Sequence, residues 1–239
     1  MSSDLFEEND DDRSSFYTEQ LLRFDSLTFF FDHPEASRTT THQHNVVYLC
    51  PQSLPKFHPS FDEVIRRLLE DDTEATVLIT FDPKRALWLR ALRKRLDPKL
   101  SDNKDRFLAI PLVKGRKFFE LLSSSTLLLD PFPFGGGVTT LEAFSVCKLV
   151  VTLPSLQTVP QLTAGMYRHM RLNDDLVLTD IDTYVEAASR LAHNVSEREA
   201  LENNLCNISR DPLLGVFQSE AAVHEWASFL ERVSRSLEI

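Results

Sequence analysis

Cysteine, glycine, methionine and tryptophan are all scarce here: the 239 residues include three Cys, six Gly, three Met and two Trp. The cysteines, Cys50, Cys147 and Cys206, are odd in number and far apart, so they do not suggest a disulfide framework. We therefore expect reduced thiols and a cytoplasmic or nuclear protein, because thiols stay reduced in those compartments. In that setting the Asn-x-Ser sequences at Asn194 and Asn207 would not be glycan acceptors.

Long hydrophobic runs and basic clusters are also missing. No apolar stretch reaches the roughly 18 residues that a membrane span needs, and Met1 to Arg13 is too acidic and polar for a secretory signal. The net charge is −10, and lysine and arginine do not gather into one long cluster, which argues against nucleic-acid binding through a basic face. We expect neither a membrane nor a nucleic acid as partner.

Metal-ligand spacing is absent as well. His58, His169 and His193 do not fall at the spacing of a metal site, and no Asp-x-Asp pair follows a predicted strand. We therefore expect no metal ion and no cofactor. Negative charge at a functional site would instead be neutralised by lysine and by a helix dipole.

Apolar residues make up 42% of the chain, enough for a large domain with a core of its own. Residues 1–15 are acidic and polar and predict a disordered tail. Residues 16–45 predict a lead-in segment, apolar from Tyr17 to Phe31, followed by a Ser/Thr-rich linker. Residues 46–239 form the compact domain.

Strand-like and helix-like segments alternate through that domain. Apolar residues recur with helical period from Phe61 to Leu69, and β-branched residues gather from Thr76 to Phe81. The predicted strands are 46–49, 76–81, 107–110, 126–129, 149–153 and 176–178. The predicted helices are 61–69, 83–96, 114–123, 159–170, 180–192, 196–208 and 217–237, and a further helix follows the glycines at 135–137. This alternation predicts an α/β fold, a Rossmann-like parallel sheet with helices on both faces and the long last helix packed across it.

The stretch from Leu127 to Pro154 carries the first candidate site, a strand followed by a glycine-rich loop, a helix and a second strand. Free backbone N–H groups and the helix dipole favour an anion where such a helix begins. Glycine lets a phosphate approach the backbone without a Cβ in the way, and threonine adds hydroxyl donors. The candidate residues are Gly135, Gly136, Gly137, Thr139 and Thr140. Most such turns bind nothing, and this one matches neither the dinucleotide fingerprint nor the Walker loop, so a purely structural turn is the alternative.

Lys56 is the second candidate. It lies in a proline-rich loop after the first predicted strand, and a lysine ammonium there can pair with a diphosphate. Ligands of parallel α/β sheets bind beyond the carboxyl ends of the strands, so the loops at 52–58, 110–114 and 131–140 should converge on one edge. A solvated surface lysine is the alternative.

Three strings make the interpretation more specific. They are D-P-F-P-F-G-G-G-V-T-T-L-E-A from Asp130 to Ala143, V-V-T-L-P from Val150 to Pro154, and C-P-Q-S-L-P-K-F-H-P from Cys50 to Pro59. Together they resemble the O-linked N-acetylglucosamine transferase and SPINDLY-like group of glycosyltransferases. The resemblance runs from about Tyr17 to the C-terminus and covers the second of the two Rossmann-like lobes of that group's GT-B fold.

The resemblance implies roles for particular residues. Gln52, Lys56 and the glycine loop would hold the diphosphate of a nucleotide sugar, with UDP-N-acetylglucosamine as the donor substrate. Glu142, expected in the first turn of the helix, would accept the ribose hydroxyls; a carboxylate that only compensates the helix dipole is the alternative. The group's first lobe and its repeats are absent, and with them the proposed catalytic base, so the catalytic residue is unknown.

Two functions remain open. The chain could be the donor-binding lobe of an inverting, metal-independent glycosyltransferase that modifies protein Ser or Thr, completed by a separate first lobe or repeat-containing chain. It could also be an inactive module that binds a nucleotide sugar or acts as a scaffold. Val138 stands where the group has Asn or His beside the phosphate, Cys147-Lys148-Leu149 stands where Gly-x-Pro is usual, and Gln161 stands near a position that is usually Arg. Together these departures suggest relaxed constraint on the site, which favours the second interpretation.

Overall fold

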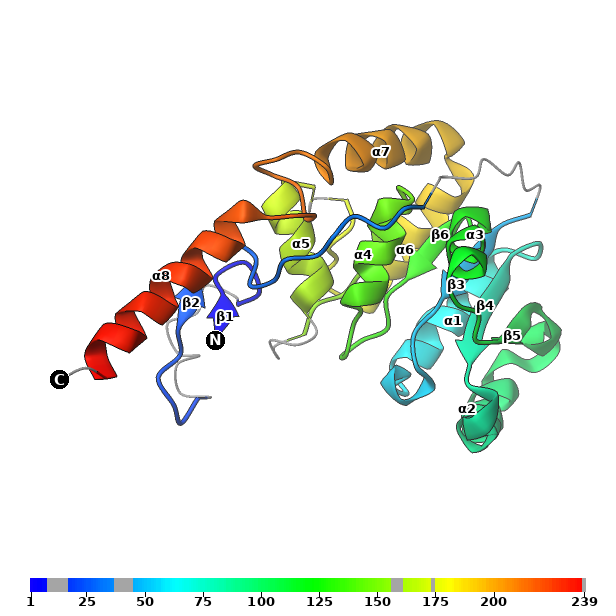
Figure 1. Ribbon diagram of the computed structural model, residues 1–239. Coiled ribbons are helices and arrows are strands. Elements are labelled where there is room, and N and C mark those ends of the chain that lie inside the picture. The colour runs from blue at the N-terminus through cyan, green and yellow to red at the C-terminus, as the bar shows by residue number, and fades with distance from the viewer. Residues whose placement is uncertain (8–16, 37–44, 156–160, 173–174, 238–239) are drawn as a thin grey trace.

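The computed structural model describes residues 1–7, 17–36, 45–155, 161–172 and 175–237 (Figure 1). Its centre is a five-stranded sheet in the order β5-β4-β3-β6-β7, and every neighbouring pair is parallel. The strands are β3 (Val47–Cys50), β4 (Thr76–Phe81), β5 (Phe107–Pro111), β6 (Leu127–Leu129) and β7 (Val150–Val151). The predicted α/β fold is confirmed. The predicted strand at 176–178 is reduced to a single bridge between Thr152 and Val177.

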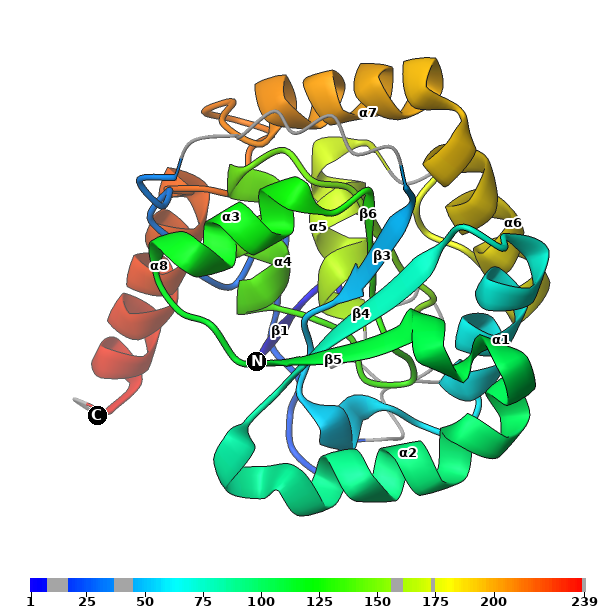
Figure 2. The ribbon, with the colours of Figure 1, turned by 90° about the vertical axis from the view of Figure 1, so that its right-hand side faces the viewer.

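Helices cover both faces of this sheet (Figure 2). Helix α1 packs against α2 and α6 on one side, and α3 packs against α4 on the other. The remaining α-helices described are α5, α7 and α8. The bounds are α1 (Phe61–Asp71), α2 (Ala86–Leu100), α3 (Arg116–Ser124), α4 (Val138–Ser145), α5 (Leu162–Met170), α6 (Ile181–His193), α7 (Val195–Ile208) and α8 (Glu220–Leu237), with short 3₁₀ turns at η2 (Leu54–Lys56), η3 (Pro83–Arg85) and η4 (Ser101–Arg106).

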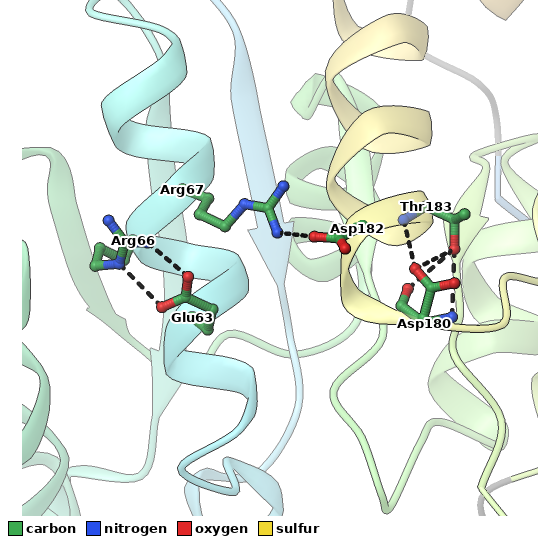
Figure 3. Close-up of polar contacts among 6 residues, drawn as sticks. All are labelled: Glu63, Arg66, Arg67, Asp180, Asp182 and Thr183. Carbon is green, nitrogen blue, oxygen red and sulfur yellow. Dashed lines mark hydrogen bonds and ion pairs between the residues drawn. The ribbon is translucent and has the colours of Figure 1, made fainter.

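Helix α1 shows why local pattern predicts these elements well. The five apolar residues that recur with helical period are all buried, and each contributes roughly 1.5–3 kcal/mol by leaving water. On its outer side Arg67 pairs with Asp182 at the start of α6 (Figure 3). Asp180 caps α6 by accepting the backbone N–H of Thr183 at 2.8 Å, which satisfies one of the free donors of that helix.

Helix α8 corrects the prediction that the last helix packs across the sheet. It lies instead against the segment that precedes the domain (Figure 1). The indole of Trp226 meets the ring of Phe24 edge-on at 5.2 Å and donates to the carbonyl of Thr28 at 2.9 Å. Glu225 accepts the backbone N–H groups of Asp25 and Ser26. The apolar lead-in segment therefore provides the surface that α8 covers.

The first seven residues also differ from expectation, because they are packed rather than disordered. Ser2–Ser3 (β1) pair in parallel with Arg23–Phe24 (β2), and Phe6 is only 2% exposed. A Cβ added to Gly165 in α5 would lie 2.2 Å from the Phe6 ring, so a glycine is needed there for the ring to fit. Residues 8–16, which include the rest of the predicted tail, and linker residues 37–44 lie outside the described part of the chain.

The cysteines correct the expectation that all three thiols are reduced. Cys147, just after α4, and Cys206, in α7, form a disulfide across 59 residues of sequence, whereas Cys50 is free and buried. Spacing along the chain did not reveal the pair because α4 and α7 meet only in the folded domain. None of the described helices is long and apolar enough to cross a membrane.

Candidate functional site

The order of the strands creates a crossing point between β3 and β6. From β3 the chain moves outward to β4 and β5, then returns past β3 to β6 and β7. The loops that follow β3 and β6 therefore leave the same edge of the sheet side by side, although 79 residues separate Lys56 from Gly135. In open α/β sheets such a reversal of strand order is where ligands bind.

Lys56 joins the two loops. Its half-buried ammonium donates to the Gln52 side-chain oxygen at 2.9 Å and to the Gly135 carbonyl at 2.8 Å, and it lies 4.9 Å from the centre of the Phe134 ring. The expected convergence of the 52–58 and 131–140 loops is confirmed. The alternative of a freely solvated lysine is excluded. Burial lowers the pKa of Lys56, while the negative charge of Asp130 opposes that shift.

Asp130 lies beneath the glycine loop and organises it. The carboxylate is only 2% exposed, and it accepts the Gly136 N–H at 2.6 Å and the Thr152 hydroxyl at 2.9 Å. Burial raises the pKa of Asp130 to about 6, against hydrogen bonds from Thr163, Thr152 and Gly136 and the charge of Lys56. Sequence reasoning missed this residue, although its place at the carboxyl end of a buried strand was a usable signal.

The glycine loop differs from expectation in how its residues are used. Gly136 already donates its N–H to Asp130, and a Cβ there would lie 2.5 Å from the Thr140 hydroxyl and 2.8 Å from the Gln52 amide. The space in front of this Cβ is therefore filled by protein. Thr140 points inward, buried, with its hydroxyl 2.9 Å from that of Thr163. Thr140 was expected to offer its hydroxyl to an anion; that hydroxyl pairs with Thr163 of α5, and the contact with an anion stays a prediction.

The start of α4 leaves other donors. The helix begins at Val138 after Gly137, with no side-chain cap, so the N–H groups of Val138 and Thr139 have no acceptor within the helix, whereas that of Thr140 donates to the Gly137 carbonyl at 3.0 Å. Thr139 is half-buried and Val138 is exposed. Gly135 lies buried beside Lys56, and a Cβ on Gly137 would meet only the Leu162 side chain, at 3.2 Å.

Glu142 is the fifth residue of α4, so it lies in the second turn and not in the expected first turn. Its side chain is half-buried, and burial raises its pKa. Within the described part of the chain its carboxylate has no hydrogen-bond or ion-pair partner. Compensation of the helix dipole is a weaker explanation here, because the dipole is felt mainly in the first turn.

A cavity of about 340 Å³ opens on the other side of Gln52. It lies beyond the carboxyl ends of β3, β4 and β5, and Leu112 brings the loop after β5 to the same edge, as predicted. Trp88 is 40% exposed there, and the Arg85 guanidinium lies 4.6 Å from the centre of its ring. The lining is Pro51, Gln52, Ser53, Leu54, Thr80, Phe81, Asp82, Arg85, Trp88 and Leu112. The sequence interpretation did not identify this cavity, because its residues come from four separate segments.

Among the described residues, no three His, Cys, Asp or Glu side chains are grouped so that they could hold a metal ion. The positive charge near the glycine loop comes from the Lys56 ammonium and the start of α4. Positive charge at this place would favour an anion.

Comparison with known proteins gives matches over part of their lengths, and no protein-family model matches the chain. Over 113 residues it is 29% identical to a UDP-glucose:protein N-β-glucosyltransferase from Actinobacillus pleuropneumoniae, a region of 43% of this chain and 17% of that protein. A mutant O-GlcNAc transferase from Thermobaculum terrenum superposes with a TM-score of 0.79 and 18% identity, over 94% of this chain and 44% of that chain. A TarM mutant from S. aureus superposes with a TM-score of 0.60 and 14% identity, over 91% of this chain and 41% of that chain.

The chain thus spans less than half of each of these proteins. At these identities the structural likeness establishes the fold. The chain is glycosyltransferase-like, and its fold is that of the C-terminal lobe of a GT-B glycosyltransferase such as an O-GlcNAc transferase, as the sequence resemblance predicted.

Proposed function

We propose that this lobe binds the nucleotide-sugar donor of a metal-independent, inverting glycosyltransferase. The observation that carries the proposal is the ammonium of Lys56, fixed at the crossing point of the sheet beside the glycine loop. A lysine ammonium has three N–H donors. Two of them hold Gln52 and Gly135, and the third has no acceptor among the residues that the structure describes, so it can serve a ligand. A diphosphate is the anion that the neighbouring start of α4 would also favour.

In the proposed reaction the acceptor oxygen attacks the anomeric carbon as the bond from that carbon to the diphosphate breaks. Negative charge grows on the leaving diphosphate, where Lys56 and the first N–H groups of α4 stabilise it. Gln52 and the threonine hydroxyl of Thr139 would orient the phosphates, and Glu142 would accept the two ribose hydroxyls. The acceptor proton needs a base, which we assign to a first lobe on the same or another chain.

The donor we propose is UDP-N-acetylglucosamine and the acceptor is protein Ser or Thr, by resemblance to O-GlcNAc transferases. The curated relative is named for UDP-glucose and an N-linked product, so sugar and acceptor both require measurement. An inactive nucleotide-sugar-binding module is the second candidate. The observation that favours it is the exposed apolar side chain of Val138 at the start of α4, where the group has a polar residue.

Calorimetric titration with UDP, GDP and their sugar conjugates tests the proposal directly. We expect UDP and UDP-N-acetylglucosamine to bind more tightly than their guanosine counterparts. Binding should be unchanged in EDTA, because Lys56 and the helix start would neutralise the diphosphate without a cation. Loss of binding in EDTA that Mg²⁺ or Mn²⁺ restores would mean a different class of transferase. Absence of binding by all four ligands would favour a scaffold.

The position of the nucleoside is a separate question, because both Glu142 and the cavity beside Trp88 could receive it. Glu142→Gln should weaken UDP binding by about tenfold, since a charge-assisted hydrogen bond is typically worth about 1.5–3 kcal/mol, and should leave pyrophosphate binding unchanged. Trp88→Ala should change neither. Weaker UDP binding in Trp88→Ala, with Glu142→Gln unaffected, would place the nucleoside in the cavity instead.

A further inference from the structure

One peptide unit of the glycine loop is held from both sides. The carbonyl of Gly135 accepts from the Lys56 ammonium at 2.8 Å, and the N–H of Gly136 donates to Asp130 at 2.6 Å. These two groups belong to the same planar peptide unit. The cation therefore lies at the negative end of its dipole and the anion at the positive end. A flipped unit would turn its carbonyl toward the carboxylate and its N–H toward the ammonium.

The backbone itself does not impose this orientation. Glycine on both sides of a peptide bond removes most steric limits on a flip, and neither Gly135 nor Gly136 has the positive φ that would mark a fixed turn. What glycine provides at Gly136 is close approach, because a Cβ there would lie 3.2 Å from the Asp130 carboxylate and nearer still to Thr140 and Gln52. The two charges, one at each end of the peptide unit, therefore favour the orientation that is seen.

Asp130 is a rigid anchor for that purpose. It follows β6 directly and its other carboxylate oxygen accepts the Thr152 hydroxyl, next to β7, at 2.9 Å. Its backbone carbonyl accepts the Tyr184 hydroxyl, from α6, at 3.1 Å. Thr163 of α5 lies close enough to lower the pKa of the carboxyl, and its hydroxyl is 2.9 Å from that of Thr140. Strand β6, Thr152 next to β7 and Tyr184 of α6 thus fix the position of Asp130, whose carboxylate reaches the loop through the Gly136 N–H.

We infer that Asp130 is the positioning residue of the glycine loop. With Lys56 it holds the Gly135–Gly136 peptide so that the Gly136 N–H faces inward and the first N–H groups of α4 and the remaining N–H of Lys56 face the ligand. The identity of that ligand, a nucleotide-sugar diphosphate, rests on the proposed function. The hold of Lys56 and Asp130 on the Gly135–Gly136 peptide does not depend on the proposed function, and it can be measured without ligand.

The charge on Asp130 gives this role a signature. Because its pKa is raised to about 6 by burial, the carboxyl loses its charge between pH 7 and pH 5. The other titratable groups that face it are Lys56, Cys50, Tyr167 and Tyr184; burial raises the pKa of the thiol and of both phenols and lowers that of the lysine from a high ordinary value. The hydrogen bond to Gly136 should therefore weaken as the pH falls.

The contribution of Asp130 to the stability of the whole domain should change with pH in the direction opposite to that of its hydrogen bond with Gly136. A carboxyl whose folded pKa lies above its unfolded value of 3.8 contributes stability that is full below pH 3.8 and is lost as pH rises through about 6. If Asp130 were only a buried structural group, protection of the Gly136 amide would rise with global stability as the pH falls. A positioning role predicts that protection of this amide falls on acidification.

The test is hydrogen exchange at the Gly136 amide, followed by NMR in the unliganded protein and corrected for the intrinsic rate at each pH. Asp130→Asn keeps the shape and can place its carbonyl on Gly136 and its amide on Thr152, but removes the charge. We expect protection about three- to tenfold lower than in the unaltered protein at pH 7.5, the difference between a charge-assisted and a neutral hydrogen bond. In Asp130→Asn, which has no carboxyl to titrate at this position, we also expect no change in Gly136 protection between pH 7.5 and 5. Thr152→Val, which removes a donor to the same carboxylate without touching the loop, should leave protection within about twofold at pH 7.5.

Equal protection of Gly136 in Asp130→Asn and the unaltered protein, or a pH dependence that persists in the variant, would overturn the inference. Affinity for UDP-N-acetylglucosamine, whose diphosphate is fully esterified and so lacks the second phosphate pKa near 6, should fall in parallel with protection. If the unaltered protein binds no nucleotide sugar, the proposed function fails while the exchange result still decides the role of Asp130.

Discussion

Replacing Lys56 with alanine is expected to weaken UDP binding by roughly tenfold to a hundredfold. The reason is the loss of one charge-assisted hydrogen bond to the diphosphate, typically worth about 1.5–3 kcal/mol. The effect could reach the upper end, because the same ammonium also holds Gln52 at 2.9 Å and Gly135 at 2.8 Å. Without it two groups beside the ligand lose their fixed positions. Calorimetric titration with UDP and with pyrophosphate measures the change, and both ligands should lose affinity to a similar degree.

Stability is the second readout for this variant. Lys56 is half-buried and donates two hydrogen bonds, so it contributes more to folding than an exposed lysine would. Its removal should cost about 1–3 kcal/mol, because the Gln52 and Gly135 acceptors are buried and lose their donor. Lys104→Ala is the matched control: it removes the same charge from an exposed lysine in η4, just before the amino end of β5. A folded Lys56→Ala protein with the UDP affinity of Lys104→Ala would contradict the proposed site.

Those elements that depend on local pattern were predictable from the sequence. The apolar stripe of α1 is complete within eleven residues, and β4 begins and ends where its β-branched run does. It was also predictable that the Lys56 and glycine loops leave the same edge of the sheet, because that follows from parallel strands alone. Their contact with each other depends on β3 and β6 being neighbours. The order β5-β4-β3-β6-β7 is a separate matter, because local pattern does not say which strands pair.

What the sequence could not provide are contacts made by residues far apart in the chain. Thr140 looks like a free hydroxyl until α5 places Thr163 2.9 Å away. The disulfide needs α4 and α7 side by side, and α8 needs the ring of Phe24, about 200 residues earlier, before its position can be known. Asp130 is the clearest case within the site: it was assigned no role from the sequence, and only the folded sheet shows its contacts with Gly136, Thr152 and Tyr184.

The glycine at position 136 is expected to be the least replaceable residue of the loop. An added Cβ would lie 2.5 Å from the Thr140 hydroxyl, 2.8 Å from the Gln52 amide and 3.2 Å from the Asp130 carboxylate. Rotating Thr140 away would break its hydrogen bond to Thr163, and moving Gln52 would release Lys56. Such overpacking typically costs about 1–3 kcal/mol, so Gly136→Ala should lower the melting temperature by about 3–10 °C.

The same substitution should also weaken UDP binding, by at least about tenfold, because the residues that must move include those that position Lys56. Gly137→Ala is the matched comparison, since its Cβ meets only the flexible end of Leu162, at 3.2 Å, and both effects should be smaller. Thermal melts and UDP titrations of the two variants separate two explanations. If the Gly136 Cβ only blocked the phosphate, affinity would fall and the melting temperature would not. A fall in both is what we expect from a side chain that enters the packed layer beneath the loop.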